Sequence, residues 1–360
     1  LGAGAIALGA AAYLEREGHE ATVWSPSGAR TAELAAGAPL VARGAVEGEF
    51  HPAVASSPRE AVAGADALLL AVPAYGHKPV LDAVAPFISE HQTLLISSHH
   101  SFGALYASRL LAERGIAIPI VAWGMTVTMG RRPEPAVVEV AGIRTEIDVA
   151  TVPASLGERG LRVCRELFGD RFREREGLLA IALSNVNPQN HMALAIGNFT
   201  RMERGEAWEQ MDYYTPAVGR LIEALDAERL AIAEACGVRV RDVFEHLHLS
   251  YGVPKASVSE MMQAIHRSGR GGLGPRSLDT RYVIEDCPYG LAMTVRLGEM
   301  TGRSARLHEA GVRLFSALYG TDFALQNDLL LALDFEEMTL EELKWRAKEG
   351  SLSPSDRRDP

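Results

Sequence analysis

The feature that most constrains the fold is the glycine-rich start of the chain, LGAGAIALGAAAYLEREG. Gly2, Gly4 and Ala7 form the pattern G-x-G-x-x-A, and a helical run continues to Arg16. In this pattern the first glycine permits a tight turn, the second lets backbone approach a pyrophosphate, and the small third residue packs on a sheet. A strand, Glu20 to Trp24, follows at the spacing of a β-α-β unit, so we predict a dinucleotide-binding site.

The backbone of this turn is expected to contact the cofactor through Gly2, Ala3, Gly4, Ala5 and Ile6. A dinucleotide fold also has a strand directly before the first glycine. The given sequence begins one residue before Gly2. We therefore expect that this strand precedes the given sequence, because the glycines would otherwise lack a rigid support.

The end of the second predicted strand bears on the choice between NADP and NAD. NAD sites usually place an acid there to bond the ribose 2′-hydroxyl. Here the residues are WSPSGAR, without a carboxylate. The hydroxyls of Ser25 and Ser27 and the guanidinium of Arg30 suit a 2′-phosphate. We expect NADP, with NAD as the alternative if Arg30 lies in an ordinary exposed turn.

Several apolar runs read as strands of a buried parallel sheet. They are Ala67 to Val72, Thr93 to Ser97, Ile118 to Ala122 and Ala136 to Val140. Val72 and Pro73 close the first run at the edge where ligands bind in such sheets, so we assign both to the cofactor site. The β-α-β-α-β order predicts a doubly wound parallel sheet, an α/β Rossmann domain, with Ser155 to Phe168 as its last helix.

Polar residues near these runs leave alternatives open. His77 either touches cofactor or substrate or lies at the surface. His99 and His100 follow the second run, but a metal site needs further ligands at suitable spacing, so we predict no metal. Arg131 and Arg132 either lie in a solvated turn or meet an anionic group.

From about Glu174 onward, runs with helical period replace the strands. We therefore predict two domains, a Rossmann domain over 1–173 and an all-α domain over 174–350, with a disordered polar tail over 351–360. The predicted helices are Leu178 to Met202, Pro216 to Cys236, Val240 to Leu249, Val258 to Arg267, Tyr289 to Thr301 and Ser304 to Leu318.

Two stretches of the second half carry chemistry. SNVNPQNH, Ser184 to His191, is unusually polar between apolar flanks, which indicates a polar cleft or a capped helix start with a core histidine. In SLDTRYVIED, Arg281 has apolar neighbours, so we expect it to be partly buried and to need an anion. Asp286 either serves a site or caps the following helix.

Composition narrows the class of partner. The net charge of −10 over 360 residues argues against nucleic acid or an anionic membrane. Three widely spaced cysteines suggest free thiols in a reducing cytoplasm. We expect small-molecule substrates, a cytoplasmic location and, as one candidate assembly, a homodimer.

These motifs together resemble the octopine/nopaline (opine) dehydrogenase family over nearly the whole chain. The matching stretches are SNVNPQNH, YYTPAVG at 213–219, LDAERLAIA at 225–233, SYG at 250–252 and LDTRYVIED with its following GL at 278–291. The loop SSHHSFG, Ser97 to Gly103, is less glycine-rich than we expect for the family.

The resemblance implies a Rossmann domain, a helical domain and an active site between them. It implies condensation of an amino acid's amine with a 2-oxo acid, followed by reduction of the imine with NAD(P)H. By motif, His191 would be the general acid/base, Asp286 its orienting partner, and Arg281 a ligand for a substrate carboxylate. An imidazole suits proton transfer near neutral pH, and a carboxylate fixes its tautomer.

Two other classes of protein share this two-domain plan. A simple 2-oxo acid reductase, of the ketopantoate reductase or glycerol-3-phosphate dehydrogenase type, typically relies on a lysine where this chain offers histidine. A non-catalytic NADP-sensing protein would not need His191, Arg281 and Asp286 together.

Overall fold

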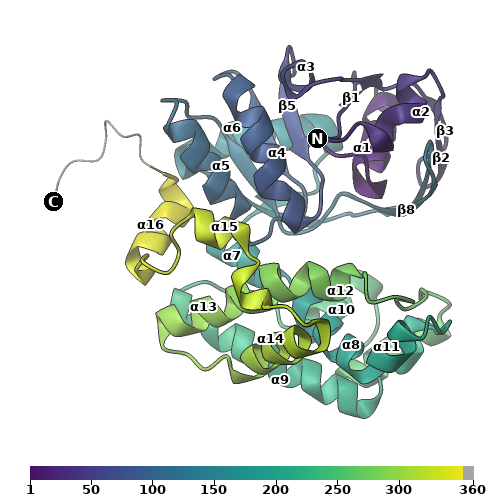
Figure 1. The fold of residues 1–360 in the computed structure, drawn as a ribbon, viewed down its shortest axis with the longest axis vertical. Helices are drawn as coiled ribbons and strands as arrows, with labels where there is room; N and C mark the ends of the chain where they lie inside the picture. Colours follow the sequence, from purple (N-terminus) through teal and green to yellow (C-terminus); the bar gives the residue numbers. More distant parts are fainter. Residues whose placement is uncertain (352–360) are drawn as a thin grey trace. The chain divides into compact units, whose positions relative to one another are not determined.

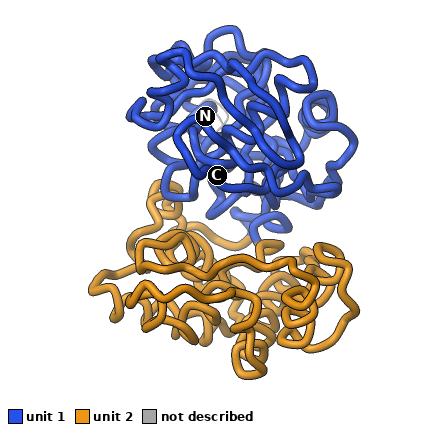
Figure 2. Tube along the Cα trace, turned by 90° about the vertical axis from the view of Figure 1, so that its right-hand side faces the viewer, with its two compact units in different colours: residues 1–182, 341–360 blue, residues 183–340 orange. Residues whose placement is uncertain are grey.

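The computed structural model describes residues 1–351, and the chain forms two compact units (Figure 2). Unit 1 comprises Leu1–Ala182 and the segment from Glu341 onward, and unit 2 comprises Leu183–Leu340. The predicted boundary at 173/174 therefore lies nine residues before the boundary of the compact units. All of the predicted tail except Ser351 lies outside the described residues.

The main sheet of unit 1 has five strands in the order β11-β10-β7-β6-β5, and β5 is labelled in Figure 1. Its members are β5 (Ala67–Leu70), β6 (Thr93–Ile96), β7 (Ile120–Trp123), β10 (Ile147–Val152) and β11 (Phe172–Glu174). β5, β6 and β7 are parallel, as predicted, and β6 and β7 are buried along their whole length. β10 was not predicted and pairs antiparallel with β7.

A second sheet in unit 1 was not predicted as such. Its order is β3-β2-β9-β8, and β8 and β9 form an antiparallel pair. Its members are β2 (Leu40–Gly44), β3 (Gly48–Phe50), β8 (Thr128–Glu134) and β9 (Val137–Ile143). The segment around Arg131 and Arg132, left open as a turn, is therefore a strand. Only β9 had been predicted, and its assignment to the main parallel sheet was wrong. β8 was missed because it is mostly exposed and lacks the apolar run of a buried strand.

The first two residues lie between strands of unit 1. The backbone amine of Leu1 donates to Leu69 O at 2.8 Å, and Ala71 N donates to Leu1 O at 2.9 Å. On the other side, Gly2 N donates to Trp24 O at 2.7 Å, at the end of β1 (Thr22–Val23). β1 itself pairs with β4 (Ala53–Val54). Leu1 and Gly2 thus lie between β1 and β5 and bond to both sides. In a dinucleotide fold this position belongs to the strand that precedes the glycine motif.

Unit 1 also contains helices. They are α1 (Ala5–Arg16), α2 (Ala32–Ala35), α3 (Pro58–Val62), α4 (His77–Val84), α5 (Gly103–Ala112), α6 (Gly157–Phe168) and α16 (Leu340–Glu349). The segment that forms α16 lies within 174–350, the range predicted for the helical domain. Its end instead contacts α5, because Ser351 N donates to Ser108 Oγ at 3.0 Å.

Unit 2 is helical, as predicted. Its longer elements are α8 (Asn187–Glu203), α9 (Pro216–Cys236), α10 (Val243–Tyr251), α11 (Val258–Arg267), α13 (Ala292–Thr301) and α14 (Arg306–Tyr319). Shorter ones are α12 (Arg281–Ile284), the π-helical turn η6 (Cys287–Leu291) and α15 (Asp328–Ala332), and α7 (Leu178–Ser184) leads in from unit 1. The single predicted helix over 178–202 is thus two helices, because the chain turns at Asn185 and Val186.

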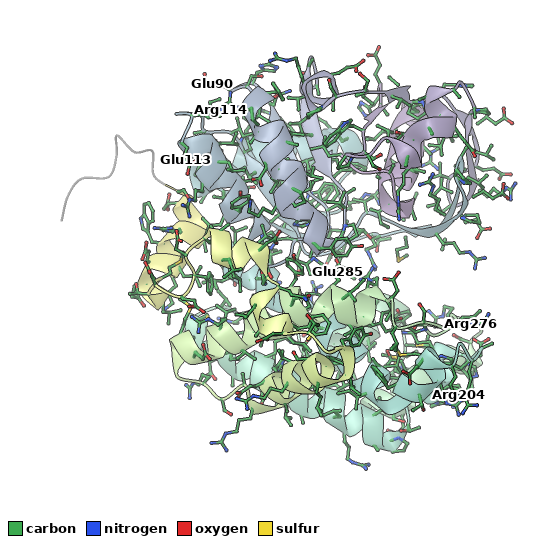
Figure 3. All side chains as sticks on the ribbon, viewed as in Figure 1. Glu90, Glu113, Arg114, Arg204, Arg276 and Glu285 are labelled. Carbon is green, nitrogen blue, oxygen red and sulfur yellow. The ribbon has the colours of Figure 1, made fainter. Side chains whose placement is uncertain are left out.

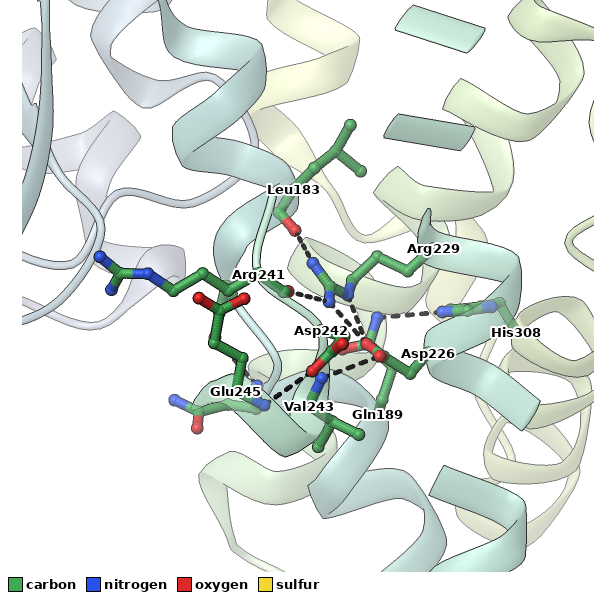
Figure 4. Close-up of polar contacts among 11 residues, drawn as sticks. Leu183, Gln189, Asp226, Arg229, Arg241, Asp242, Val243, Glu245 and His308 are labelled. Carbon is green, nitrogen blue, oxygen red and sulfur yellow. Dashed lines mark hydrogen bonds and ion pairs between the residues drawn. The ribbon is translucent and has the colours of Figure 1, made fainter. Parts of the chain in front are cut away.

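A buried ion pair holds α9 to its neighbours within unit 2 (Figure 4). Arg229 Nη2 lies 2.6 Å from Asp226 Oδ1, and both side chains are buried. Arg229 also donates to the carbonyls of Leu183 and Arg241, and Asp226 Oδ2 accepts from Val243 N at 2.9 Å. Because every charge here has several partners, the family-like stretch at 225–233 fixes α7, α9 and α10 together rather than binding a ligand.

Within residues 1–351, no helix is both long and apolar enough to cross a membrane. Cys164, Cys236 and Cys287 are buried and form no disulfide among the described residues.

Candidate active site and cofactor site

A short hydrogen bond joins the two predicted catalytic residues in unit 2. His191 Nδ1 lies 2.6 Å from Asp286 Oδ2, although the residues are 95 positions apart. Asp286 is fully buried, and 11% of the His191 side chain is exposed. A carboxylate oxygen can only accept, so His191 Nδ1 carries the proton and Nε2 is the nitrogen left for proton exchange.

Tyr282 fixes the plane of the His191 ring. The two rings stack with centroids 3.6 Å apart and planes 7° apart. Burial raises the pKa of Tyr282 to about 12, so the phenol stays protonated and donates to Gln210 Oε1 at 2.6 Å. With Asp286 at its edge and Tyr282 on its face, the imidazole has one orientation, as a general acid/base requires.

Asp286 does not cap the following helix, which was the alternative role for this residue. Asp286 precedes η6, but its side chain makes no capping hydrogen bond there. Its carboxylate faces His191 instead. The amide side chain that does stabilise a helix start is Asn185, whose Oδ1 accepts from Asn187 N at 3.0 Å.

The first turn of α8, which carries His191, is fixed from two sides. Gly290 in η6 packs so closely on Pro188 that a Cβ atom there would lie 2.3 Å from Pro188 Cγ. Elsewhere on the turn, Gln189 Nε2 lies 3.0 Å from His308 Nε2 (Figure 4). His308 Nδ1 in turn lies 2.8 Å from Glu228 Oε2. The carboxylate makes Nδ1 the donor of His308, so Nε2 accepts from Gln189.

Arg281 does not have the predicted burial. Its side chain is 55% exposed and lies 3.7 Å from Glu285 Oε2, measured from Nε; Glu285 is labelled in Figure 3. The prediction was wrong because the segment is helical in α12, so the apolar neighbours in sequence point to other sides. Arg281 stands one residue before Tyr282, and its guanidinium is partly open to a solute.

The glycine motif has the geometry expected for a dinucleotide. Gly2 has φ 122°, and a Cβ atom there would lie 2.5 Å from Ala71 O, so only glycine fits. The space around the Gly4 Cα is open. α1 begins directly after Gly4, with no capping side chain and no acid in its first turn. Its amides and dipole therefore suit an anionic pyrophosphate beside Ala3, Ala5 and Ile6.

The end of β1 offers polar groups beside this motif. Ser25 is buried, and its Oγ has no hydrogen-bond partner among the described residues, while Ser27 and Arg30 are exposed. From the sequence, Arg132 either lay in a solvated turn or met an anionic group. Its Nη1 donates to Ala3 O at 2.7 Å and its Nη2 to Arg30 O at 2.8 Å. Arg132 therefore ties the glycine turn to the segment that carries Arg30.

The end of β5 lies against the same turn. A Cβ atom at Gly2 would also lie 2.9 Å from Val72 Cγ1, and Pro73 follows at the surface. His77, His99 and His100 are all buried, so the alternative of a surface position for His77 is excluded. Among residues 1–351, no group of three histidine, cysteine or acidic side chains could hold a metal ion.

Two family models match separate parts of the chain. Residues 174–319 match the family model for the NAD/NADP octopine/nopaline dehydrogenase α-helical domain. Residues 1–153 match the ketopantoate reductase PanE/ApbA model.

Proteins that match nearly the whole chain are also opine dehydrogenases, like the family model that matches the helical domain. The chain is 32% identical over 335 residues to an opine dehydrogenase of Arthrobacter sp. (strain 1C), covering 91% of this chain and 92% of the relative. A solved octopine dehydrogenase with NADH and L-arginine superposes with a TM-score of 0.77 at 17% identity, covering 96% of each chain. A yersinopine dehydrogenase with bound NADP+ gives 0.73 at 15% identity, covering 96% of this chain and 98% of that one.

Proposed function

The chain belongs to the opine dehydrogenase family and is an NAD(P)-dependent oxidoreductase acting on CH–NH bonds, and we propose that His191 and Asp286 carry its proton transfer. The observation that carries this proposal is the 2.6 Å bond between His191 Nδ1 and Asp286 Oδ2. In the reaction, an amine and a 2-oxo acid lose water to form an imine. A hydride and a proton then convert the imine to a secondary amine.

The proton steps need a group that gains and loses a proton near neutral pH. With Nδ1 held by Asp286, His191 Nε2 takes a proton from the ammonium of the incoming amino acid, which frees its lone pair for attack. The imidazolium so formed is stabilised by the Asp286 carboxylate. It then returns the proton during reduction, and the bound cofactor supplies the hydride.

Arg281 is proposed to bind a substrate carboxylate. Both substrate classes carry one, and a guanidinium binds it with two parallel hydrogen bonds. Glu285 lies 3.7 Å from Arg281 Nε and keeps the side chain near its helix while leaving it open to solvent. Lysine offers a point charge and would not reproduce the fork.

For the cofactor we propose NADP in preference to NAD. Ser25, Ser27 and Arg30 follow β1 without a carboxylate, and Arg132 lies close by. Burial lowers the pKa of Arg132, and the nearby charge of Arg30 lowers it further, whereas Glu33 acts in the opposite direction. Two guanidiniums in proximity favour an anion such as a 2′-phosphate. The yersinopine dehydrogenase with NADP+ is a precedent for NADP in the fold.

Product labelling tests the reaction. The enzyme would be supplied with cofactor deuterated at C4 of the nicotinamide, a 2-oxo acid and a panel of amino acids, and the products analysed by mass spectrometry. We expect a secondary amine with one deuterium on the former carbonyl carbon. A deuterated 2-hydroxy acid as the only product would instead identify a simple 2-oxo acid reductase.

The substrates are proposed to be an amino acid and a 2-oxo acid, in line with relatives solved with L-arginine or with pyruvate. A homodimer and a cytoplasmic location stay predictions. Sedimentation of the purified protein and fractionation of cells test them.

A further inference from the structure

Three histidines of unit 1 gather at one edge of the main sheet. β5 and β6 are parallel neighbours, with Leu70 paired to Ile96, so their carboxyl ends lie side by side. His77 begins α4 shortly after β5, and His99 and His100 follow β6. The rings of His77 and His100 lie 6.4 Å apart. Ligands of such sheets bind at this edge.

Two of these histidines are buried without hydrogen bonds. Their exposed fractions are 0% for His77 and 1% for His99, and no ring nitrogen of either has a hydrogen-bond partner among residues 1–351. The Val72 backbone lies close enough to favour a protonated His77 slightly, but it does not meet hydrogen-bond geometry. Buried polar groups are normally paired, so the four unpaired nitrogens of His77 and His99 indicate a site for a polar ligand.

The backbone that carries His99 is held in an uncommon conformation. Ser98, Ser101 and Phe102 have φ of 62°, 43° and 59°, and among residues 1–351 only Asp334 is a further non-glycine residue with positive φ. Two hydrogen bonds hold the loop between Ser98 and Ser101. His99 N donates to Trp123 O at 2.8 Å, and His100 Nδ1 donates to Ser98 O at 2.8 Å. Strain of this kind persists where the surroundings impose it, and it concentrates at ligand sites.

Burial disfavours the charged forms of His77 and His99. Burial lowers the pKa of His77 to about 3, with the neighbouring His100 adding to the effect, and burial likewise holds the pKa of His99 well below its ordinary value. A neutral imidazole offers one donor and one acceptor. A carboxamide has the complementary groups, two N–H donors and a carbonyl acceptor. Neutral rings also avoid repulsion with the positive ring of an oxidised nicotinamide.

The course of a dinucleotide brings a carboxamide to this edge. The glycine turn, which suits the pyrophosphate, lies between Trp24 at the end of β1 and Ala71 at the end of β5. If the adenosine half lies on the side of Ser25 and Arg30, the nicotinamide half lies on the side of β5 and β6. We propose that His77 and His99 bind the carboxamide of the nicotinamide and so fix which face of its ring is presented. The proposal rests on the use of a nicotinamide cofactor.

Calorimetry with two ligands tests the assignment without any turnover. NADPH carries the nicotinamide, and 2′-phospho-ADP-ribose lacks it. We expect His77→Phe and His99→Phe each to weaken NADPH binding about tenfold, the scale of one or two lost hydrogen bonds. Binding of 2′-phospho-ADP-ribose should stay unchanged. His99→Asn keeps a donor and an acceptor and should retain more affinity for NADPH than His99→Phe.

Phenylalanine removes polar atoms that have no partner among the described residues, and unchanged binding of 2′-phospho-ADP-ribose shows that each variant is folded. His91→Phe is the matched control. It lies just before β6 at the opposite end of the same strand, and its ring is exposed. This variant should bind both ligands like the wild type.

An analogue with an acetyl group in place of the carboxamide adds a second measurement. It should bind the wild type more weakly than NADPH does, and the difference should shrink in His99→Phe. Equal losses for NADPH and 2′-phospho-ADP-ribose, or no loss, would overturn the proposal. A raised KM for the 2-oxo acid with unchanged NADPH affinity would also overturn it and assign the histidines to that substrate. A wild type that binds neither NADPH nor NADH would contradict the proposed function itself.

Discussion

His191 and Asp286 meet through a 2.6 Å hydrogen bond between Nδ1 and Oδ2 in the helical unit. They come from α8 and from the residue before η6, and Gly290 in η6 packs directly on Pro188 in α8. The contact that aligns the two elements therefore lies one helical turn from the pair it aligns. Tyr282 on the face of the ring completes the orientation.

The first prediction concerns this pair. His191→Ala should lower turnover by about 10² or more, the usual scale for a lost general acid/base. Asp286→Asn should have a large effect of the same kind, because an amide can donate to Nδ1 and invert the tautomer. Steady-state rates together with cofactor affinities check both variants, and the affinities should not change.

The double variant separates a shared role from two independent ones. Residues that act as a unit are not additive, so His191→Ala with Asp286→Asn should be no slower than His191→Ala alone. Multiplied losses in the double variant would mean that Asp286 acts apart from His191.

The second prediction concerns Arg281. Arg281→Lys should raise the KM of one substrate about tenfold with a smaller change in kcat, because a point charge replaces a fork. Arg204→Lys serves as a control, since Arg204 is an exposed arginine of the same unit (Figure 3). Unchanged KM values for both substrates in the Arg281 variant would remove the assigned role.

The third prediction concerns cofactor choice. Arg30→Ala should weaken NADPH binding about tenfold and NADH binding much less, because only NADPH carries the 2′-phosphate. Arg43→Ala, at an exposed position of β2, is the control. Equal weakening of the two cofactors would show that Arg30 does not contact the phosphate.

The fourth prediction concerns stability and pH. Burial alone would raise the pKa of Glu228, but hydrogen bonds from His308 and from the Leu307 amide outweigh it, so the pKa lies below its ordinary value. The native state thus binds fewer protons at this group than the unfolded state, and stability rises with pH. Its contribution is present above the unfolded pKa and is lost as pH falls through the lower folded pKa.

Glu228→Gln should therefore cost about 1–2 kcal/mol in the free energy of unfolding at neutral pH, the scale of a charge-assisted hydrogen bond. The difference from wild type should shrink below about pH 4, near the ordinary pKa of glutamate. Urea unfolding at several pH values measures this. Glu234→Gln, at an exposed position of α9, should show neither effect, and a pH-independent loss at Glu228 would contradict the charge argument.

Local sequence signals predicted helices best where their ends are marked. α9 and α11 have the predicted limits because Thr215 and Ser257 cap their starts and Gly237 ends α9 in a left-handed turn. β10 was missed although five of its six residues are buried, since its run is interrupted by Asp148 and Thr151 and its antiparallel pairing with β7 departs from the repeating unit.

The site residues likewise were predicted only in part. Resemblance of motifs selected His191 and Asp286, but their contact depends on packing over 95 residues and cannot be read from spacing. The predicted burial of Arg281 was wrong because its apolar neighbours in sequence were taken to be its neighbours in space. His77 and His99 gave no local signal of their shared environment, which arises from the pairing of β5 with β6.

The initial rate of NADPH and NADH oxidation by the full-length protein tests the proposed reaction most directly. Pyruvate, 2-oxoglutarate and related 2-oxo acids would be supplied with and without each of a panel of amino acids. We expect oxidation only when an amino acid and a 2-oxo acid are both present. Equal oxidation with the 2-oxo acid alone would contradict it, and no oxidation with any pair would favour a protein that binds NADP without catalysis.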